Sequence, residues 1–425
     1  MTRLTDIALV VFLASLALNW PDLPLGIRFP DLIFLPLALL TVAAFRRTRC
    51  SPQWLDLLVL LYLLGSLPSF LVTGDLRESA TELIRHAYVV AIYAVVARLV
   101  ASSRAPLAGT GLAIGGVALS LIGLTFAGIY MVHPVAMPAM GEVMRLPYVG
   151  GVLRLRALTM APSMLGSLLA ATVPFALIRA LQSNAAKSRR RWALAVAAIC
   201  AAMLLTVSHT IAGFAVACLI VLWPELRPRA AVQWLAIAAA AVVVCGFNFT
   251  LAASIDSVSS TSARAPDAVT YPYGMETREL ELGGVRVRYQ VMSYLRTKQV
   301  ALDAFLSRPL TGIGLDQFHR ASEAAYQRGL LTAGYRAIDP HSALLGCLAE
   351  TGLAGGTTLL VLWGGFVVAG VRLSRVDGPY GWLARAATAA FIGLLINGIN
   401  VDIMNFRFVW AELGILRGLA QLYEV

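Results

Sequence analysis

The sequence predicts an all-α polytopic membrane protein with about twelve transmembrane helices. Of its 425 residues, 59% are hydrophobic and only 13% are charged, and the mean hydropathy is +0.76. A soluble domain carries roughly 25% charged residues, so this chain lacks the polar surface to face water on all sides. Its apolar residues also gather in repeated runs of about 18–25 residues, the length that a transmembrane helix needs.

Two polar stretches divide these runs. We expect nine spans within residues 1–252, interrupted by a short polar segment at 133–158. Residues 253–340 form a long polar loop between spans nine and ten, and residues 341–425 carry the last three spans. The predicted spans are 4–20, 32–45, 54–73, 85–98, 106–132, 159–181, 192–208, 210–223, 234–252, 341–371, 381–401 and 408–423.

Positive charge gives the spans an orientation. The net charge of +11 would suggest a nucleic-acid partner in a soluble protein, but here the basic residues cluster in short loops between apolar runs. Such loops face the cytoplasm and contact anionic lipid headgroups. With a cytoplasmic N-terminus all of the clusters fall inside, which predicts both termini in the cytoplasm, both polar segments outside, and no nucleic-acid partner. The clusters lie at 46–49, 98–104, 187–191, 227–229 and 372–375.

Motifs for nucleotide, metal or disulfide chemistry are missing from the sequence. It has no Walker-type loop, no HExxH and no DxD-like acidic pair in the polar segments, so neither a metal nor a cofactor is predicted. The five cysteines show no CxxC pairing, which implies neither a disulfide nor a metal site. The first apolar run has no small-residue cleavage site, and we expect it to remain as a span.

The long polar segment should contain amphipathic helices. Residues 257–272 are rich in Ser, Thr, Ala and Pro, which is typical of a loose loop. Residues 288–306 have helical spacing of apolar positions, and Pro309 with the glycines of 312–314 predicts a turn after that helix. We expect a second short helix over 315–330, lying on the membrane surface.

Three arginines are candidates for phosphate binding. Arg154 and Arg156 precede the sixth span, and Arg288 opens the expected amphipathic helix. Because a guanidinium group offers a planar fork of donors, arginines at a membrane boundary suit a diphosphate. They equally suit pairing with lipid headgroups, and the residues alone leave both interpretations open.

Two histidines are candidates for substrate chemistry. His341 follows Asp339-Pro340 at the start of the tenth span. A neutral imidazole accepts a proton near pH 7, so His341 is a candidate general base for a hydroxyl acceptor. The alternative is an interfacial histidine that donates to a backbone carbonyl. His209, between spans seven and eight, either contacts a polar substrate or caps a helix end.

Three motifs stand in a fixed order along the chain. Arg156-Ala-Leu-Thr-Met-Ala-Pro-Ser-Met-Leu-Gly opens the sixth span, Arg288 precedes Arg308-Pro-Leu-Thr-Gly-Ile-Gly, and Pro340-His341 opens the tenth span. Together with the span layout, they resemble the O-antigen ligase and polymerase superfamily of bacterial envelope glycosyltransferases. The likeness covers residues 141–356 in motifs and the whole chain in topology. Ser342 stands where the family often has Asn, and Ser208-His-Thr where it often has Ser-Arg-Gly.

This resemblance implies an O-antigen ligase that needs neither metal nor cofactor. The donor would be a glycan on undecaprenyl diphosphate and the acceptor a sugar hydroxyl of lipid A–core, transferred with inversion to complete lipopolysaccharide. His341 would be the catalytic base, and Arg156 and Arg288, helped by Arg154, would bind the diphosphate. His209 either replaces the family's arginine or makes no phosphate contact. We expect the enzyme in the bacterial inner membrane with its active site facing the periplasm.

Other functions remain open from the sequence. One dominant late outer loop favours a ligase over an O-antigen polymerase, and a protein O-oligosaccharyltransferase belongs to the same superfamily. A lipid-linked sugar transporter would need polar residues at mid-span in corresponding halves, and the sequence shows neither such residues nor an internal repeat.

Overall fold

The computed structural model describes most of the chain. The described residues are 2–20, 27–45, 51–134, 137–146, 150–226, 230, 232–236, 239, 249–257, 275–282, 285–292, 294–331, 336 and 339–424.

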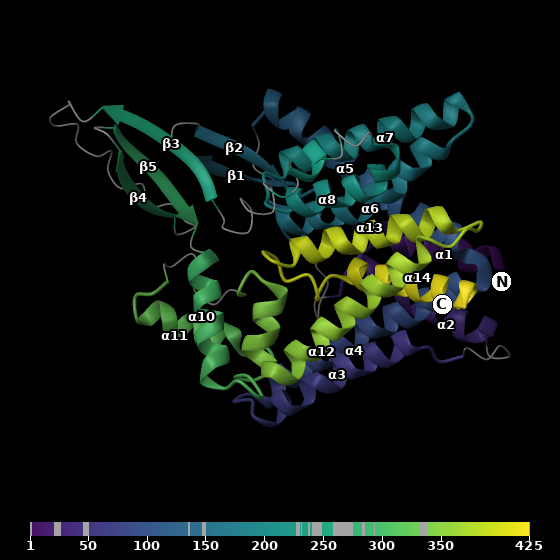
Figure 1. Cartoon of the computed structure of the whole chain (residues 1–425), viewed down its shortest axis with the longest axis horizontal. Helices are drawn as coiled ribbons and strands as arrows, with labels where there is room; N and C mark the ends of the chain where they lie inside the picture. Colours follow the sequence, from purple (N-terminus) through teal and green to yellow (C-terminus); the bar gives the residue numbers. More distant parts are fainter. Residues whose placement is uncertain are drawn as a thin grey trace.

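A bundle of long helices forms the body of the molecule (Figure 1). A helix is found at eleven of the twelve predicted spans. Of the remaining one, 234–252, residues 234–236 and 239 are helical, 249–252 are extended and not helical, and the rest lies outside the described residues. The bundle helices are α1 (Thr2–Ser15), α2 (Phe29–Phe45), α3 (Trp54–Leu71), α4 (Leu76–Leu99), α5 (Ala105–Val132), α6 (Pro162–Gln182), α7 (Ala186–Leu205), α8 (Ile211–Leu222), α12 (Ala343–Leu373), α13 (Gly381–Asn397) and α14 (Arg407–Tyr423).

The lengths and composition of these helices are those of a membrane protein. Within the described residues, four helical stretches are long and apolar enough to cross a bilayer. Helices α2, α8 and α13 include shorter apolar stretches. The protein is therefore a predominantly helical membrane protein. The four candidate spans are Trp54–Leu71, Leu76–Val132, Pro162–Gln182 and Ala343–Leu373.

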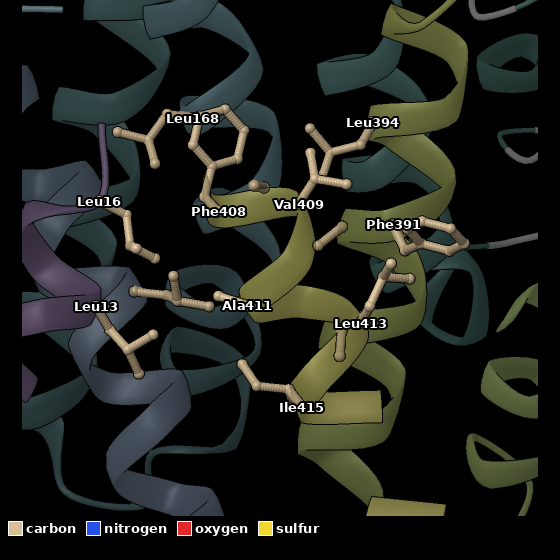
Figure 2. Packing of buried hydrophobic residues seen from close by; sticks show 14 of the residues in the cluster. Leu13, Leu16, Leu168, Phe391, Leu394, Phe408, Val409, Ala411, Leu413 and Ile415 are labelled. Atoms are coloured by element: carbon tan, nitrogen blue, oxygen red, sulfur yellow. The ribbon is translucent and has the colours of Figure 1, made fainter. Parts of the chain in front are cut away.

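Helix α14 forms the centre of the bundle. All residues from Phe408 to Ala420 are buried, as expected of a helix that neighbours surround on every side. Figure 2 shows Phe408 beside Leu168 of α6 and Val409 beside Leu394 of α13. The apolar core therefore continues from the first helices of the chain to the last.

The two ends of the bundle differ. Figure 1 shows the N- and C-termini at one end, which we call the terminal end, and the strands with α10 and α11 at the other, which we call the polar end. Arg104 pairs with Asp6 at 2.6 Å near the N-terminus. At the N-terminus of α14, on the polar side of the bundle, Arg407 binds Asp31 through two hydrogen bonds of 2.9 and 2.7 Å.

Both polar segments contain strands, which the sequence reading did not predict. Residues 133–158 fold into the antiparallel hairpin of β1 (Gly141–Leu146) and β2 (Gly150–Leu155). The long segment begins with a three-stranded antiparallel sheet of order β3-β5-β4, made of β3 (Phe249–Ser257), β4 (Met275–Leu282) and β5 (Val285–Met292). Two helices follow the sheet, α10 (Tyr294–Ser307) and α11 (Phe318–Gln327).

The prediction that Arg288 opens an amphipathic helix is wrong. Arg288 lies in β5, where it is paired with Ser254 of β3 and Glu279 of β4, and α10 begins only at Tyr294. The residues of β5, Val-Arg-Val-Arg-Tyr-Gln-Val-Met, alternate between apolar and polar, which is the period of a strand. The expected loop at 257–272 falls almost entirely outside the described residues.

Candidate functional site

A turn at residues 309–314 is inserted into a break in α12. Gly352 interrupts the helix with φ +63° and ψ −157°, a conformation that glycine adopts without a Cβ clash. Across the break, the Leu353 amide donates to the Pro309 carbonyl at 2.7 Å, and the Ile313 amide donates to the Ala349 carbonyl at 2.9 Å. Two further bonds run from Gly314 N to Glu350 O at 3.1 Å and from Ala354 N to Leu310 O at 3.4 Å.

These four hydrogen bonds satisfy backbone groups that the break in α12 would otherwise leave unpaired, because buried amides and carbonyls need partners. It also fixes α10 and α11 over α12. A small apolar core joins the three helices through Val300 and Ala304 of α10, Phe318 and Ala325 of α11, and Ala349 of α12. The Arg308-Pro-Leu-Thr-Gly-Ile-Gly motif thus positions α10 and α11, the second half of the polar segment, over α12.

Helix α10 presents Tyr294 and Lys298 toward the start of α12. The two residues are one turn apart and share a face of the helix. The rings of Tyr294 and His341 have centroids 4.1 Å apart. The rings of Tyr294 and His209 form a T-shaped pair with centroids 6.0 Å apart. Both histidines therefore contact the same tyrosine, although they are far apart in the sequence.

Asn400, in the connection between α13 and α14, joins this group from another side. Its backbone carbonyl is 3.1 Å from Nε2 of His209, and its side-chain oxygen accepts a hydrogen bond from Nζ of Lys298. We call His209, Tyr294, Lys298, His341 and Asn400 the histidine cluster. Its members come from four separate parts of the sequence, so sequence periodicity gives no direct sign of it.

The two histidines of the cluster differ in their electrostatics. Burial, together with smaller effects of nearby cationic groups such as Arg154 and Lys298, lowers the pKa of His209 to about 3. His209 is thus neutral at pH 7 and supplies no positive charge in place of an arginine. Its bond to the Asn400 carbonyl also shows that it does not cap α8.

His341 lies in a strained turn before α12, with φ +49°. Its backbone amide donates to Oδ1 of Asp339 at 2.7 Å, and Nδ1 of its ring is 3.6 Å from the same oxygen. Burial lowers the pKa of His341 below its usual 6.5, while Asp339 raises it and Lys298 lowers it. The imidazole is therefore neutral at pH 7 and able to accept a proton.

Lys298 supplies positive charge to the cluster. Burial lowers the pKa of its ammonium group to about 8, so the group is still mostly protonated at pH 7. Lys298 and His341 interact electrostatically, which places a cation beside the candidate base. Lys298 was not among the residues predicted for the site.

The side chains of the predicted arginines Arg154 and Arg156 have different partners. Arg154 of β2 forms a 2.8 Å ion pair with Glu142 of β1, donates to the Thr206 carbonyl at 3.4 Å, and acts on His209 through its charge. Arg156 donates to the Met160 carbonyl. Its buried Nε has no hydrogen-bond partner among the described residues.

The structure thus brings His341, His209 and Arg154 into one neighbourhood. Arg156 is two residues from Arg154 in the chain. Within the described residues its side chain bonds only to the Met160 carbonyl of its own turn, while its backbone amide donates to the Met140 carbonyl at 2.8 Å. Arg288 is placed by its backbone in β5, six residues before Tyr294. Tyr294 and Asn400 are members of the cluster that the sequence reading did not assign to the site.

Comparison with known proteins bears on the same part of the chain. Residues 193–360 match a family model described as O-antigen ligase. The match runs from α7 into α12 and includes His209, Tyr294, Lys298 and His341, together with the 309–314 turn. No curated protein matches the chain at a significant level.

Proposed function

We propose that this chain, which belongs through residues 193–360 to the O-antigen ligase superfamily, is itself a ligase. It transfers the O-antigen glycan from undecaprenyl diphosphate to a sugar hydroxyl of lipid A–core and so completes lipopolysaccharide. The observation that carries this proposal is the placement of His341. This neutral imidazole is held by Asp339 on one side and has the cation Lys298 on the other.

The proposed topology has twelve spans in the bacterial inner membrane, with both termini in the cytoplasm. The separation of the terminal end from the polar end supports it, because the chain ends and the basic α6–α7 connection lie together, away from the strands (Figure 1). The proposed units are residues 1–252 with the 133–158 segment, the loop 253–340, and residues 341–425. The polar end then faces the periplasm.

In the proposed reaction the acceptor hydroxyl attacks the anomeric carbon of the donor glycan. His341 takes the hydroxyl proton as the new C–O bond forms. The bond between the anomeric carbon and the phosphate oxygen breaks, and its electron pair leaves with undecaprenyl diphosphate. Direct attack of this kind inverts the anomeric configuration. Because a sugar hydroxyl is a weak nucleophile, a positioned base speeds the step by about 10²–10⁴-fold.

Cations stabilise the charge that develops on the departing diphosphate. We assign this role to Arg156 and Arg288, with Arg154 as helper, and add Lys298. The unpartnered Nε of Arg156 supports the assignment, since a buried donor without a partner favours an incoming acceptor. Losing one such donor from a site of developing charge typically costs about 10²–10³ in rate.

Lipopolysaccharide from a deletion strain tests the ligase against its relatives. Loss of all O-antigen from lipid A–core, with polymerised donor chains still present, is the result expected for the ligase. A single repeat on the core would point to an O-antigen polymerase. Unchanged lipopolysaccharide with unglycosylated protein would point to a protein O-oligosaccharyltransferase. A purified protein that forms no product and only moves the lipid-linked sugar would be a transporter.

A further inference from the structure

A cavity lies beside the histidine cluster, and of its lining residues the mechanism above uses only Asp339. It has a volume of about 250 Å³ and lies among α3, α4 and α12 under the start of α11. This is smaller than the roughly 300–1,000 Å³ of drug-sized ligand sites, so the cavity has room for about one sugar ring. Residues that line it include Tyr62, Glu82, His86, Asp316, Phe318 and Glu350.

The charge of this cavity is opposite to that of the histidine cluster. Its lining carries the carboxyl groups of Glu82, Asp316, Asp339, Glu350 and Asp402 and, among the described residues, no lysine or arginine. Such a lining repels a diphosphate. It suits a ligand that donates hydrogen bonds, because an ionised carboxylate only accepts them.

One of these acids, Asp402, stands near the boundary between its charged and neutral forms. Burial raises the pKa of Asp402 to about 7, and burial also raises the pKa of Asp316. Near neutral pH the cavity therefore holds both carboxylate acceptors and carboxylic acid donors. A sugar hydroxyl, which both donates and accepts, matches such a lining.

His86 shows that the cavity has unused hydrogen-bonding capacity. The residue is 7% exposed and lines the cavity. Its Nε2 is 3.6 Å from Oε1 of Glu82, while its Nδ1 has no hydrogen-bond partner among the described residues. Since a buried polar atom without a partner is unfavourable, a polar ligand that bonds to Nδ1 of His86 would remove the penalty.

The cavity reaches the candidate base through consecutive residues. Asp339 and Pro340 line it, and His341 follows directly, with Nδ1 3.6 Å from Oδ1 of Asp339. His341 also packs against Tyr294, with the two ring planes tilted by 59°, and interacts electrostatically with Lys298. His341 thus separates an acidic compartment from a basic one.

We propose that the acidic cavity is the acceptor subsite, which binds the receiving sugar ring of lipid A–core through its hydroxyl groups. The aromatic faces of Tyr62 and Phe318 add apolar contact for the C–H face of the ring. The carboxylates exclude the donor diphosphate, so each substrate enters the compartment that matches its charge. This inference rests on the proposed ligase function and adds the location and chemistry of acceptor binding.

Steady-state transfer kinetics of the purified full-length protein test this subsite, with lipid A–core lacking O-antigen as acceptor. Asp316→Asn and Glu82→Gln should each raise the acceptor KM about tenfold or more, since a hydrogen bond to a charged group is worth about 1.5–3 kcal/mol. The donor KM should not change. Asp303→Asn is the matched control, because Asp303 is exposed on α10 and does not line the cavity.

A measurement on the wild-type protein applies if those variants fail to fold. Cys347 lines the cavity as a free thiol, whereas Cys200 and Cys218 do not line it. Lipid A–core should slow the reaction of Cys347 with a small methanethiosulfonate, which forms a mixed disulfide and releases methanesulfinate, and leave Cys200 and Cys218 unaffected. Equal protection of all three thiols would overturn the subsite. A reaction rate of Cys347 that lipid A–core leaves unchanged would overturn it too.

The outcomes separate this inference from the proposed function. Wild-type protein that transfers no glycan to lipid A–core would refute the ligase itself. Wild-type transfer combined with an unchanged acceptor KM in both cavity variants, or with an equal rise in donor KM, would refute only the subsite.

Discussion

Replacing Gly352 by alanine is expected to release the 309–314 turn from α12. At φ +63° an L-residue costs about 1–2 kcal/mol, and the added Cβ would lie 2.5 Å from the carbonyl carbon of Leu310. The turn must then withdraw and lose the four backbone hydrogen bonds that join it to α12. At about 1 kcal/mol for each bond, the free energy of unfolding should fall by about 5–6 kcal/mol.

Gly329→Ala provides the matched control for this change. Gly329 also has a positive φ, +76°, but a Cβ there would meet nothing within 4 Å. Only the backbone strain applies, about 1–2 kcal/mol. Chemical unfolding of both variants in detergent, followed by tryptophan fluorescence, gives the two losses. If Gly352→Ala cost no more than Gly329→Ala, the turn would not depend on this close approach.

The glycan-transfer rates of the two variants should rank in the same order as their stabilities. Helix α10 carries Tyr294 and Lys298 and is held over α12 by the turn and the small apolar core. Gly352→Ala should therefore lower the transfer rate of the protein that remains folded, while Gly329→Ala should leave it near wild type.

The remaining predictions concern charge. His341 accepts a proton only when neutral, so transfer should fall as the pH drops through its pKa, which lies below 6.5. Asp339 raises that pKa and Lys298 lowers it; in pH–rate profiles Asp339→Asn should therefore move the acid limb to lower pH and Lys298→Met to higher pH. Shifts in the same direction would contradict the assigned electrostatics. Arg407→Met should cost about 3 kcal/mol in chemical unfolding, because it removes the ion-pair partner of Asp31 where both side chains are only 18% exposed, although Tyr88 and the Arg28 amide still donate to that carboxylate. A loss below about 1 kcal/mol, typical of a surface pair, would show that the pair is effectively solvated.

The helices of the bundle could be predicted because the composition of the chain and the length of its apolar runs determine them directly. The predicted span 54–73 coincides with α3 to within two residues, and the predicted start of span eleven at Gly381 is the start of α13. The strands were missed where polar residues suggested loops or helices. In β5 the alternation of valine with arginine was the available signal.

The histidine cluster could be predicted only in part. His341 and His209 stand out as single polar residues at the ends of apolar runs, but their shared contact with Tyr294 depends on how α10 is placed. That placement follows from the break at Gly352, and nothing in the local sequence states that residues 309–314 fill it. The acidic cavity could not be predicted for the same reason, because its carboxylates come from separate segments of the chain.

Purified protein in lipid vesicles, given an undecaprenyl diphosphate-linked glycan, lipid A–core and excess EDTA, tests most directly whether guanidinium groups and an imidazole drive transfer. We predict full turnover by the wild type and losses of at least about 10²-fold for Arg156→Ala and Arg288→Ala and for His341→Ala. Turnover that requires added Mg²⁺ or Mn²⁺, or folded variants that keep the wild-type rate, would contradict this mechanism.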